Sequence, residues 1–500
     1  MKHQSLWFDT DEPPAGYPAL EGERRVDVAV VGAGITGMTA ALLLARAGRS
    51  VAVLDQHAVA GGTTGHSTAK ITSQHGQIYE SLRLTHGRGT ARAYAEAMES
   101  AKERIAGLVG EGIACGFRRR AAYVYGSEES HRRRLEREAE AASQAGLPAT
   151  FVETAPLPFD THGAVRFDDQ AEFDPRAYVA GLARLLVDAG GAVFERTRAH
   201  QVHEGAPCRV ETERGTLLAD DVVIATLMPF LDRGGFFARA HARRSYIVTA
   251  RIAEAPPDGM FISAGSPTRS LRAHPVGGSE LLLVGGESHH VGSTAAQPER
   301  YEQLIEFARR HWDVRSIEHA FSSQDFSPDD HVPYAGRLHL RSSHVYVATG
   351  LNKWGITAGT AAAGVISDAL LGRENEWSGL FSSTRIRPLQ EAPRFVLENT
   401  RVGFRFFAER LKQRGTRPIA DLAPGEGAIV SAAGKKVAGF RDADGRLHAV
   451  SSRCTHLGCQ VVWNAAERTW DCPCHASRFD VDGSVLNGPA VKPLERRDPG

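Results

Sequence analysis

Residues 26–37 read VDVAVVGAGITG, an apolar run that leads directly into a Gly-x-Gly-x-x-Gly motif. A short continuous apolar run is typical of a buried parallel strand. The next stretch, MTAALLLARAG, residues 38–48, predicts a helix that ends at Gly48. Residues 50–54 predict a second strand, which is followed by Asp55. This order of strand, glycine turn, helix, strand and acid indicates a dinucleotide-binding βαβ unit of an α/β fold.

Each conserved feature of this motif type has a physical role in holding a dinucleotide. Gly32 permits the tight turn, Gly34 lets the backbone approach a pyrophosphate, and Gly37 lets the helix pack on the strand. The helix N-terminus offers partial positive charge to the phosphates. Asp55 is placed to accept hydrogen bonds from ribose hydroxyls. We therefore expect these four residues to bind the cofactor.

The overall composition is that of an ordinary globular protein. The chain has 500 residues, enough for about three domains, and its 59 basic and 59 acidic side chains cancel. A neutral chain gives no electrostatic reason to bind nucleic acid or an anionic membrane. No stretch predicts a transmembrane helix, and the first residues contain no apolar signal segment, so we expect a cytoplasmic protein.

A second motif lies near the C-terminus and combines thiols with imidazoles. Its first half is Cys454-Thr-His456-Leu-Gly-Cys459, and its second half is Cys472-Pro-Cys474-His475-Ala-Ser477. Two cysteines and two histidines can hold either a Rieske [2Fe–2S] cluster or a zinc ion. The ligands predicted from this pattern are Cys454, His456, Cys472 and His475.

The same segment resembles the Rieske family in its remaining residues. The tail Phe479–Ala490, with Gly488-Pro-Ala, is similar to the strand and proline loop that cover a Rieske cluster, which favours the cluster over zinc. The resemblance implies a disulfide between Cys459 and Cys474 and a hydroxyl hydrogen bond from Ser477 to the cluster. Phe479 stands where high-potential members have Tyr, so we expect a lower potential than in respiratory-chain centres.

The N-terminal part resembles the D-amino-acid-oxidase-like flavoproteins, the family of glycine and sarcosine oxidases. The resemblance covers about residues 24–372 and implies FAD rather than NAD. It rests on the loop AVAGGTTGHSTAK at 58–70 and on YVATGLNKWGITAG at 346–359, whose helix start faces the flavin ring in the family. The further cofactor residues that it implies are Gly62, Thr64, Ser67, Gly350, Trp354 and Gly355.

The sequence departs from this family where the substrate is bound. Amino-acid oxidases carry a carboxylate-binding Arg a few residues before an Asp-Gly-x-Pro turn. The corresponding turn here starts at Asp330, and five residues earlier stands Asp325. An acid there favours a cationic amine substrate, although Asp325 is equally typical of a turn cap. Arg272 and His289 lie in the expected substrate region, and either can also be structural.

These observations predict the domain organisation. Residues 1–380 form the flavoprotein, with FAD-binding segments at 24–80, 150–228 and 330–375 and the inserted α+β substrate region at 81–149 and 229–329. Residues 381–416 form a linker. Its stretch 394–414 has helical apolar spacing, which favours packing on a domain over a membrane-surface helix. Residues 417–500 form a small all-β Rieske domain.

The predicted function follows from joining the two cofactors on one chain. A flavin accepts two electrons as a hydride, whereas a Rieske cluster carries one. We expect an FAD-dependent dehydrogenase that oxidises a small amine and passes electrons singly through the cluster to an external carrier. Two alternatives remain: a reductase that runs from carrier to cluster to FAD, and a non-enzymatic redox sensor. The sequence assigns no catalytic residue beyond the candidates Asp325, Arg272 and His289.

Overall fold

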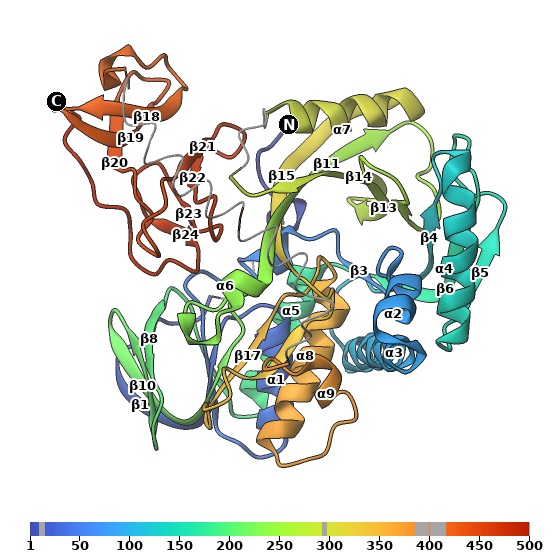
Figure 1. Ribbon diagram of the computed structural model, residues 1–500, viewed down its shortest axis with the longest axis horizontal. Helices are drawn as coiled ribbons and strands as arrows, with labels where there is room; N and C mark the ends of the chain where they lie inside the picture. Colours follow the sequence, from blue (N-terminus) through green and yellow to red (C-terminus); the bar gives the residue numbers. More distant parts are fainter. Residues whose placement is uncertain (10–15, 293–297, 386–399, 401–416, 500) are drawn as a thin grey trace.

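The computed structural model describes residues 1–9, 16–292, 298–385, 400 and 417–499. Two large sheets form the body of the molecule, and two small sheets near the C-terminus pack against it (Figure 1). Apart from residue 400, the predicted connecting helix at 394–414 lies outside the described residues. Within the described part of the chain, no helix is both long and apolar enough to span a membrane.

The first large sheet is built on the predicted βαβ unit. Its central strands run parallel in the order β17-β10-β1-β2-β7, while β16, β9 and β8 extend it antiparallel. The strands are β1 Gly22–Val31, β2 Val51–Leu54, β7 Ala192–Phe194, β8 Ala199–His203, β9 Cys208–Thr212, β10 Gly215–Ile224, β16 Tyr334–Arg337 and β17 Val345–Thr349. Buried apolar side chains on both faces of β1 and β2 explain why these strands occupy the middle of the sheet.

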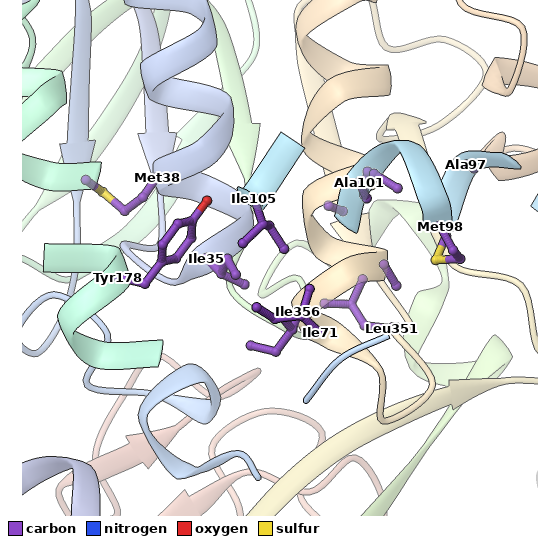
Figure 2. Close-up of a cluster of buried hydrophobic side chains, with 14 of the residues drawn as sticks. Ile35, Met38, Ile71, Ala97, Met98, Ala101, Ile105, Tyr178, Leu351 and Ile356 are labelled. Atoms are coloured by element: carbon purple, nitrogen blue, oxygen red, sulfur yellow. The ribbon is translucent and has the colours of Figure 1, made fainter. Parts of the chain in front are cut away.

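Helices cover the first sheet and connect it with the neighbouring helical layer. The helices are α1 Ile35–Arg46, α3 Arg88–Gly110, α5 Pro175–Asp188 and α8 Gly355–Leu370. Figure 2 shows where they meet: Ile35 and Met38 of α1 lie beside Ile105 of α3 and Tyr178 of α5, with Ile356 of α8 next to them. This shared core fixes the turn after β1 and the start of α8 relative to each other.

The second large sheet forms the other wall of the molecule. Its strand order is β15-β11-β14-β13-β12-β4-β6-β3, with β5 paired to β6. The strands are β3 Lys70–Ile71, β4 Arg118–Tyr125, β5 Ala149–Val152, β6 Ala164–Glu172, β11 Ala240–Ile252, β12 Met260–Ser263, β13 Arg269–Val276, β14 Ser279–His290 and β15 Val314–Pro328. Three further helices pack around it: α2 Ile78–His86, α4 Arg132–Gln144 and α7 Pro298–His311 (Figure 1).

In the described residues 417–499, the regular secondary structure consists of β-strands and one short 3-10 helix, Ile419–Asp421. A three-stranded antiparallel sheet holds β18 Gly427–Ala432, β19 Lys435–Arg441 and β20 Leu447–Ser451. A four-stranded sheet holds β21 Val462–Asn464, β22 Thr469–Asp471, β23 Arg478–Phe479 and β24 Val485–Asn487. The observed architecture confirms the predicted fold class, an α/β body with an inserted α+β region and a small all-β domain.

Candidate functional site

A cavity of about 570 Å³ is lined by residues of both large sheets. This volume lies within the range of small-molecule and cofactor sites. Most of the predicted cofactor residues line it, namely Gly32, Gly34, Asp55, Gly62, Thr64, Ser67, Trp354 and Gly355. Gly37 and Gly350 lie outside the lining.

Two glycines make the tight turn at the cavity possible. Gly32 has φ +112°, and a Cβ there would stand 2.6 Å from the carbonyl oxygen of Ala225. A Cβ on Gly37 would stand 1.9 Å from the carbonyl oxygen of Gly32, which no side chain could accommodate. The turn therefore brings the N-terminus of α1 close to whatever occupies the cavity, as a pyrophosphate requires.

Asp55 lies at the end of β2 and holds the same turn together. Its carboxylate accepts hydrogen bonds from the backbone N–H groups of Ala33 (2.7 Å) and His57 (2.8 Å). Burial raises the pKa of Asp55, against the opposing effect of these two donors. The predicted hydrogen bond to a ribose remains a prediction, and Asp55 lines the cavity where such a bond would form.

The N-terminus of α8 also borders the cavity. Trp354 is the residue before the helix, and its ring stacks on His75 with centroids 4.8 Å apart and an interplanar angle of 12°. Lys353, Trp354, Gly355 and Ile356 all line the cavity. The partial positive charge of a helix N-terminus can stabilise negative charge that develops on a bound flavin.

Asp325 lies in the cavity lining, but its oxygens are used by the protein. The carboxylate accepts hydrogen bonds from the backbone N–H groups of Phe326 (2.7 Å) and Lys353. Burial raises the pKa of Asp325 to about 6, although these two donors act to lower it. The side chain thus holds the turn before α8, which is the structural alternative that the sequence left open.

The other two catalytic candidates do not line the cavity. Arg272 is buried beside Glu172, 3.1 Å away, and donates to the carbonyl oxygens of Thr68 and Ala69. His289 lies 3.1 Å from the hydroxyl of Tyr246, and burial lowers its pKa to about 4. Both residues therefore contact residues of the cavity wall without lining the cavity themselves.

Cationic side chains gather near Asp325 instead. Lys353 donates to the hydroxyl of Ser288 (2.6 Å), and Arg243 donates to the same hydroxyl (3.3 Å). All three residues line the cavity. Burial and the charge of Arg243 lower the pKa of Lys353 to about 8. This end of the cavity is suited to an anionic group on a substrate.

The predicted metal ligands lie in two similar loops of the C-terminal sheets. In the first loop, the N–H of Gly458 donates to the carbonyl oxygen of Cys454, and in the second the N–H of Ala476 donates likewise to Cys472. Gly458 and Ala476 occupy matching positions, and both have left-handed backbone conformations, φ +79° and φ +61°. A left-handed conformation favours glycine, and Ala476 adopts it although it carries a side chain.

Cys459 and Cys474 form a disulfide that joins the two loops, as the family resemblance implied. The sulfur atoms of Cys459, Cys472 and Cys474 lie within 4.8 Å of one another, a spacing that by itself would fit a metal. The disulfide removes two of these sulfurs as thiolate ligands. Cys454 and Cys472 remain as the free thiols of the two loops.

The four predicted ligands fit a Rieske [2Fe–2S] cluster. The Nδ1 atoms of His456 and His475 are buried and have no hydrogen-bond partner among the described residues, which is the state expected of ligand atoms. The two imidazole rings have centroids 5.0 Å apart. Burial lowers the pKa of His475 to about 4, which keeps it neutral. Cys454 and Cys472 would hold one iron and the histidines the other.

The two residues expected to influence the cluster are both buried. Ser477 accepts a hydrogen bond from the N–H of Ala490 (3.0 Å). Hydrogen bonds from Cys472 and Ser477 lower the pKa of Cys454 to about 7, although burial opposes them. Phe479 is fully buried in the core of the cluster-binding sheet and offers no hydroxyl. Ser477 is thus placed to donate a hydrogen bond to a cluster ligand, whereas Phe479 has no group that could donate one.

The histidine edge of the predicted cluster faces the body of the molecule. Asp232 Oδ1 lies 2.7 Å from His456 Nε2. The ring of Phe237 meets that of His475 edge-on, with centroids 4.9 Å apart. Both residues lie in the segment between β10 and β11 (Figure 1). The sequence offered no signal for either, because neither belongs to a motif.

A buried polar network also joins the cavity to the second cluster loop. Gln324, which lines the cavity, donates through Nε2 to the carbonyl oxygen of Ala476 (2.9 Å). Arg244 donates to the other end of the same amide (2.9 Å) and pairs with Asp471 at 3.4 Å. The side chains of Arg244 and Asp471 are almost wholly buried. Sequence reasoning missed these residues, since their pairing depends on how the sheets pack.

Comparison with known proteins agrees with both parts of this site. Residues 27–369 match the family model of FAD dependent oxidoreductases, and residues 416–497 match that of the Rieske [2Fe-2S] domain. The protein YhfW of Bacillus subtilis, named as a Rieske 2Fe-2S iron-sulfur protein, is 34% identical over 498 residues, covering 99% of this chain and 97% of its own.

Solved structures show the same flavoprotein fold. Glycine oxidase from Geobacillus kaustophilus superposes with a TM-score of 0.59 at 20% identity, covering 73% of this chain and 99% of its own. L-proline dehydrogenase from P. horikoshii gives a TM-score of 0.58 at 16% identity, covering 73% and 98%. The chain belongs to the FAD dependent oxidoreductase family and carries a C-terminal Rieske [2Fe-2S] domain.

Proposed function

We propose that this FAD-dependent oxidoreductase is a dehydrogenase that oxidises a small amine carrying an anionic group, and that its electrons leave singly through the Rieske cluster to an external carrier. When bound, FAD supplies a two-electron acceptor for a hydride and the cluster supplies a one-electron carrier. The amine loses a hydride and a proton to become an imine. The chain's own residues bind the substrate, support the cofactors and connect the two sites.

Lys353 and Arg243 support the anionic part of this proposal. Both donate to Ser288, and both line the cavity beside the N-terminus of α8. A carboxylate placed there would receive charge-assisted hydrogen bonds. Lys70 adds a further amine to the lining, and burial together with the charge of Arg272 lowers its pKa to about 7.

The position of Asp325 bears on the kind of amine that the cavity would accept. A free carboxylate would favour a purely cationic substrate. Asp325 instead directs its oxygens at the N–H groups of Phe326 and Lys353, so it has less to offer a ligand. The balance of charge at this end therefore supports an amine with a carboxylate, as in an amino acid, more than a simple diamine.

The observation that carries the electron-transfer part is the contact between Gln324 and Ala476. Gln324 lines the cavity, and Ala476 directly follows the predicted ligand His475 in the chain. A single hydrogen bond thus separates a wall of the flavin site from a cluster loop. Since the contact is buried, no layer of solvent stands between the two sites at this point.

The experiment is an anaerobic titration of the purified holoenzyme with amino acids, simple amines and diamines. The flavin absorption and the cluster's electron paramagnetic resonance (EPR) signal are followed together. The proposal expects an amine with a carboxylate to reduce both centres. Reduction by diamines alone would restore the cationic-substrate hypothesis. Reduction of both centres only by a reduced carrier protein would instead assign a reductase, and reduction without turnover would assign a sensor.

A further inference from the structure

The segment from β24 to residue 492 in the Rieske domain forms part of the cavity wall. The carbonyl oxygen of Val485 accepts a hydrogen bond from Arg198 (2.8 Å), and that of Leu486 lies 3.1 Å from His57 Nε2. Arg198 and His57 line the cavity on the side of Asp55. The segment contributes four lining residues of its own, namely Asn487, Gly488, Ala490 and Val491. The nucleotide end of the flavin site is therefore closed by the C-terminal domain.

The other side of the same segment holds both cluster loops. The N–H of Ala490 donates to the hydroxyl of Ser477 in the second loop (3.0 Å). The carbonyl oxygen of Lys492 accepts from the hydroxyl of Thr455 in the first loop (2.5 Å). Thr455 stands between the predicted ligands Cys454 and His456. Within about eight residues, the backbone thus contacts the flavin cavity and each half of the cluster site.

We propose that residues 485–492 are a shared binding element, so that the cluster strengthens the binding of FAD and FAD strengthens the retention of the cluster. The physical reason is ordering. A bound cluster fixes the two loops and, through Ser477 and Thr455, holds the segment in the position that completes the flavin site. FAD then binds to a segment that is already ordered, so FAD binding no longer carries the entropy loss of ordering residues 485–492. The inference rests on the two cofactor sites and not on the direction of electron flow.

Thermodynamic linkage makes this proposal testable from both sides. If the cluster raises the affinity for FAD by some factor, FAD must raise the affinity for the cluster by the same factor. The affinity for FAD is measured on variants, and the retention of the cluster is measured on the wild type. Misfolding of a variant therefore cannot explain both results. The coupling expected for an element of this kind is about fivefold or more in each affinity.

The first measurement compares FAD dissociation constants in full-length chains, by quenching of flavin fluorescence. The variant Cys472→Ser removes a ligand and prevents cluster assembly, and Cys208→Ser is the matched control, because Cys208 is a buried free cysteine in β9. We expect Cys472→Ser to bind FAD at least about fivefold more weakly and Cys208→Ser to match the wild type. Equal dissociation constants for Cys472→Ser and the wild type would overturn the proposal.

The second measurement uses only wild-type protein. FAD is removed, and the rate of iron loss to a chelator is compared with that of the holoenzyme by the visible circular dichroism of the cluster. The proposal expects faster iron loss without FAD and recovery of the slow rate when FAD is added back. An unchanged rate would overturn it, whether or not the enzyme's substrate is known, since neither readout is catalytic activity.

Discussion

Asp232 Oδ1 lies 2.7 Å from Nε2 of His456, so a carboxylate of the flavoprotein part meets a cluster ligand of the Rieske domain. The imidazole would bind iron through its buried Nδ1 and present Nε2 to Asp232. The side chain of Asp232 is 46% exposed, whereas that of His456 is 5% exposed. The two domains thus meet at the two predicted histidine ligands of the cluster.

This contact predicts the direction of a change in cluster potential. A reduced cluster carries one more negative charge, which a nearby carboxylate disfavours, so Asp232→Asn should raise the midpoint potential. The interaction of a partly exposed charge is worth about 0.2–1 kcal/mol, which corresponds to about 10–40 mV for a one-electron couple. Redox titration of the cluster EPR signal measures the shift. A fall in potential, or none, would contradict this view of the contact.

Phe479 provides a second prediction for the potential. Its ring is fully buried in the core of the cluster-binding sheet. Phe479→Tyr adds the hydroxyl that high-potential Rieske proteins have, and should raise the midpoint potential because the hydroxyl stabilises the reduced form. Ser477→Ala is the matched variant: it removes a hydroxyl and should lower the midpoint potential. Redox titration of both variants checks the pair, and the absence of an upward shift in Phe479→Tyr would disprove the hydroxyl argument.

The disulfide between Cys459 and Cys474 should contribute mainly to stability. It closes a loop with a sequence separation of 15, for which chain entropy gives about 3 kcal/mol. The double variant Cys459→Ala, Cys474→Ala should therefore lower the unfolding free energy of the Rieske domain by about that amount. Denaturant unfolding followed through cluster absorption measures it, with Cys208→Ala as a control outside the cluster loops. Equal midpoints for the double variant and the wild type would argue against this role.

Lys353 predicts a pH dependence of substrate capture. Its pKa is lowered to about 8, so the ammonium form prevails below that pH and is lost above it. The value of kcat/KM for an anionic amine should therefore fall as the pH rises through about 8, since kcat/KM reports groups of the free enzyme. Lys353→Met should lower kcat/KM about tenfold or more at pH 7, as expected for a lost charge-assisted hydrogen bond.

Two variants give the matched comparison for Lys353. Lys353→Arg keeps its charge at all accessible pH values, so the alkaline fall should disappear. Lys435→Met changes an exposed lysine of β19, remote from the cavity lining, and should leave the profile unchanged. If Lys353→Arg keeps the wild-type fall above pH 8, another group is responsible and Lys353 does not bind the substrate anion.

The local parts of this site could be predicted from the sequence because each lies within a short stretch of chain. The strand, glycine turn, helix and Asp55 occur within 30 residues and fold as one unit. The four metal ligands and the disulfide lie in two loops whose spacing identifies the family. In both cases the chemistry depends on neighbours in sequence, and the observed strands β1 and β2 agree with the predicted ones.

The contacts between domains could not be predicted in this way. Asp232 and His456 are 224 positions apart, and Gln324 and Ala476 are 152 apart. Their meeting depends on how the Rieske domain packs on the body of the molecule. Asp325 illustrates the same limit: its place in the cavity lining could be anticipated, but the use of its oxygens depends on the turn at Lys353.

The most direct test of the proposed electron path is rapid anaerobic mixing of the holoenzyme with the amine identified by titration, with flavin absorption and the cluster EPR signal recorded over one turnover. We expect the flavin to be reduced first and the cluster afterwards. In Gln324→Leu the cluster phase should slow at least about tenfold while the flavin phase is unchanged. Tyr301→Phe removes another hydrogen bond between the domains, from Tyr301 to Glu467, but leaves Gln324 on Ala476, and should behave as the wild type. A cluster that is reduced before the flavin, or one that stays oxidised beside a fully reduced flavin, would contradict the path from substrate through FAD to the cluster.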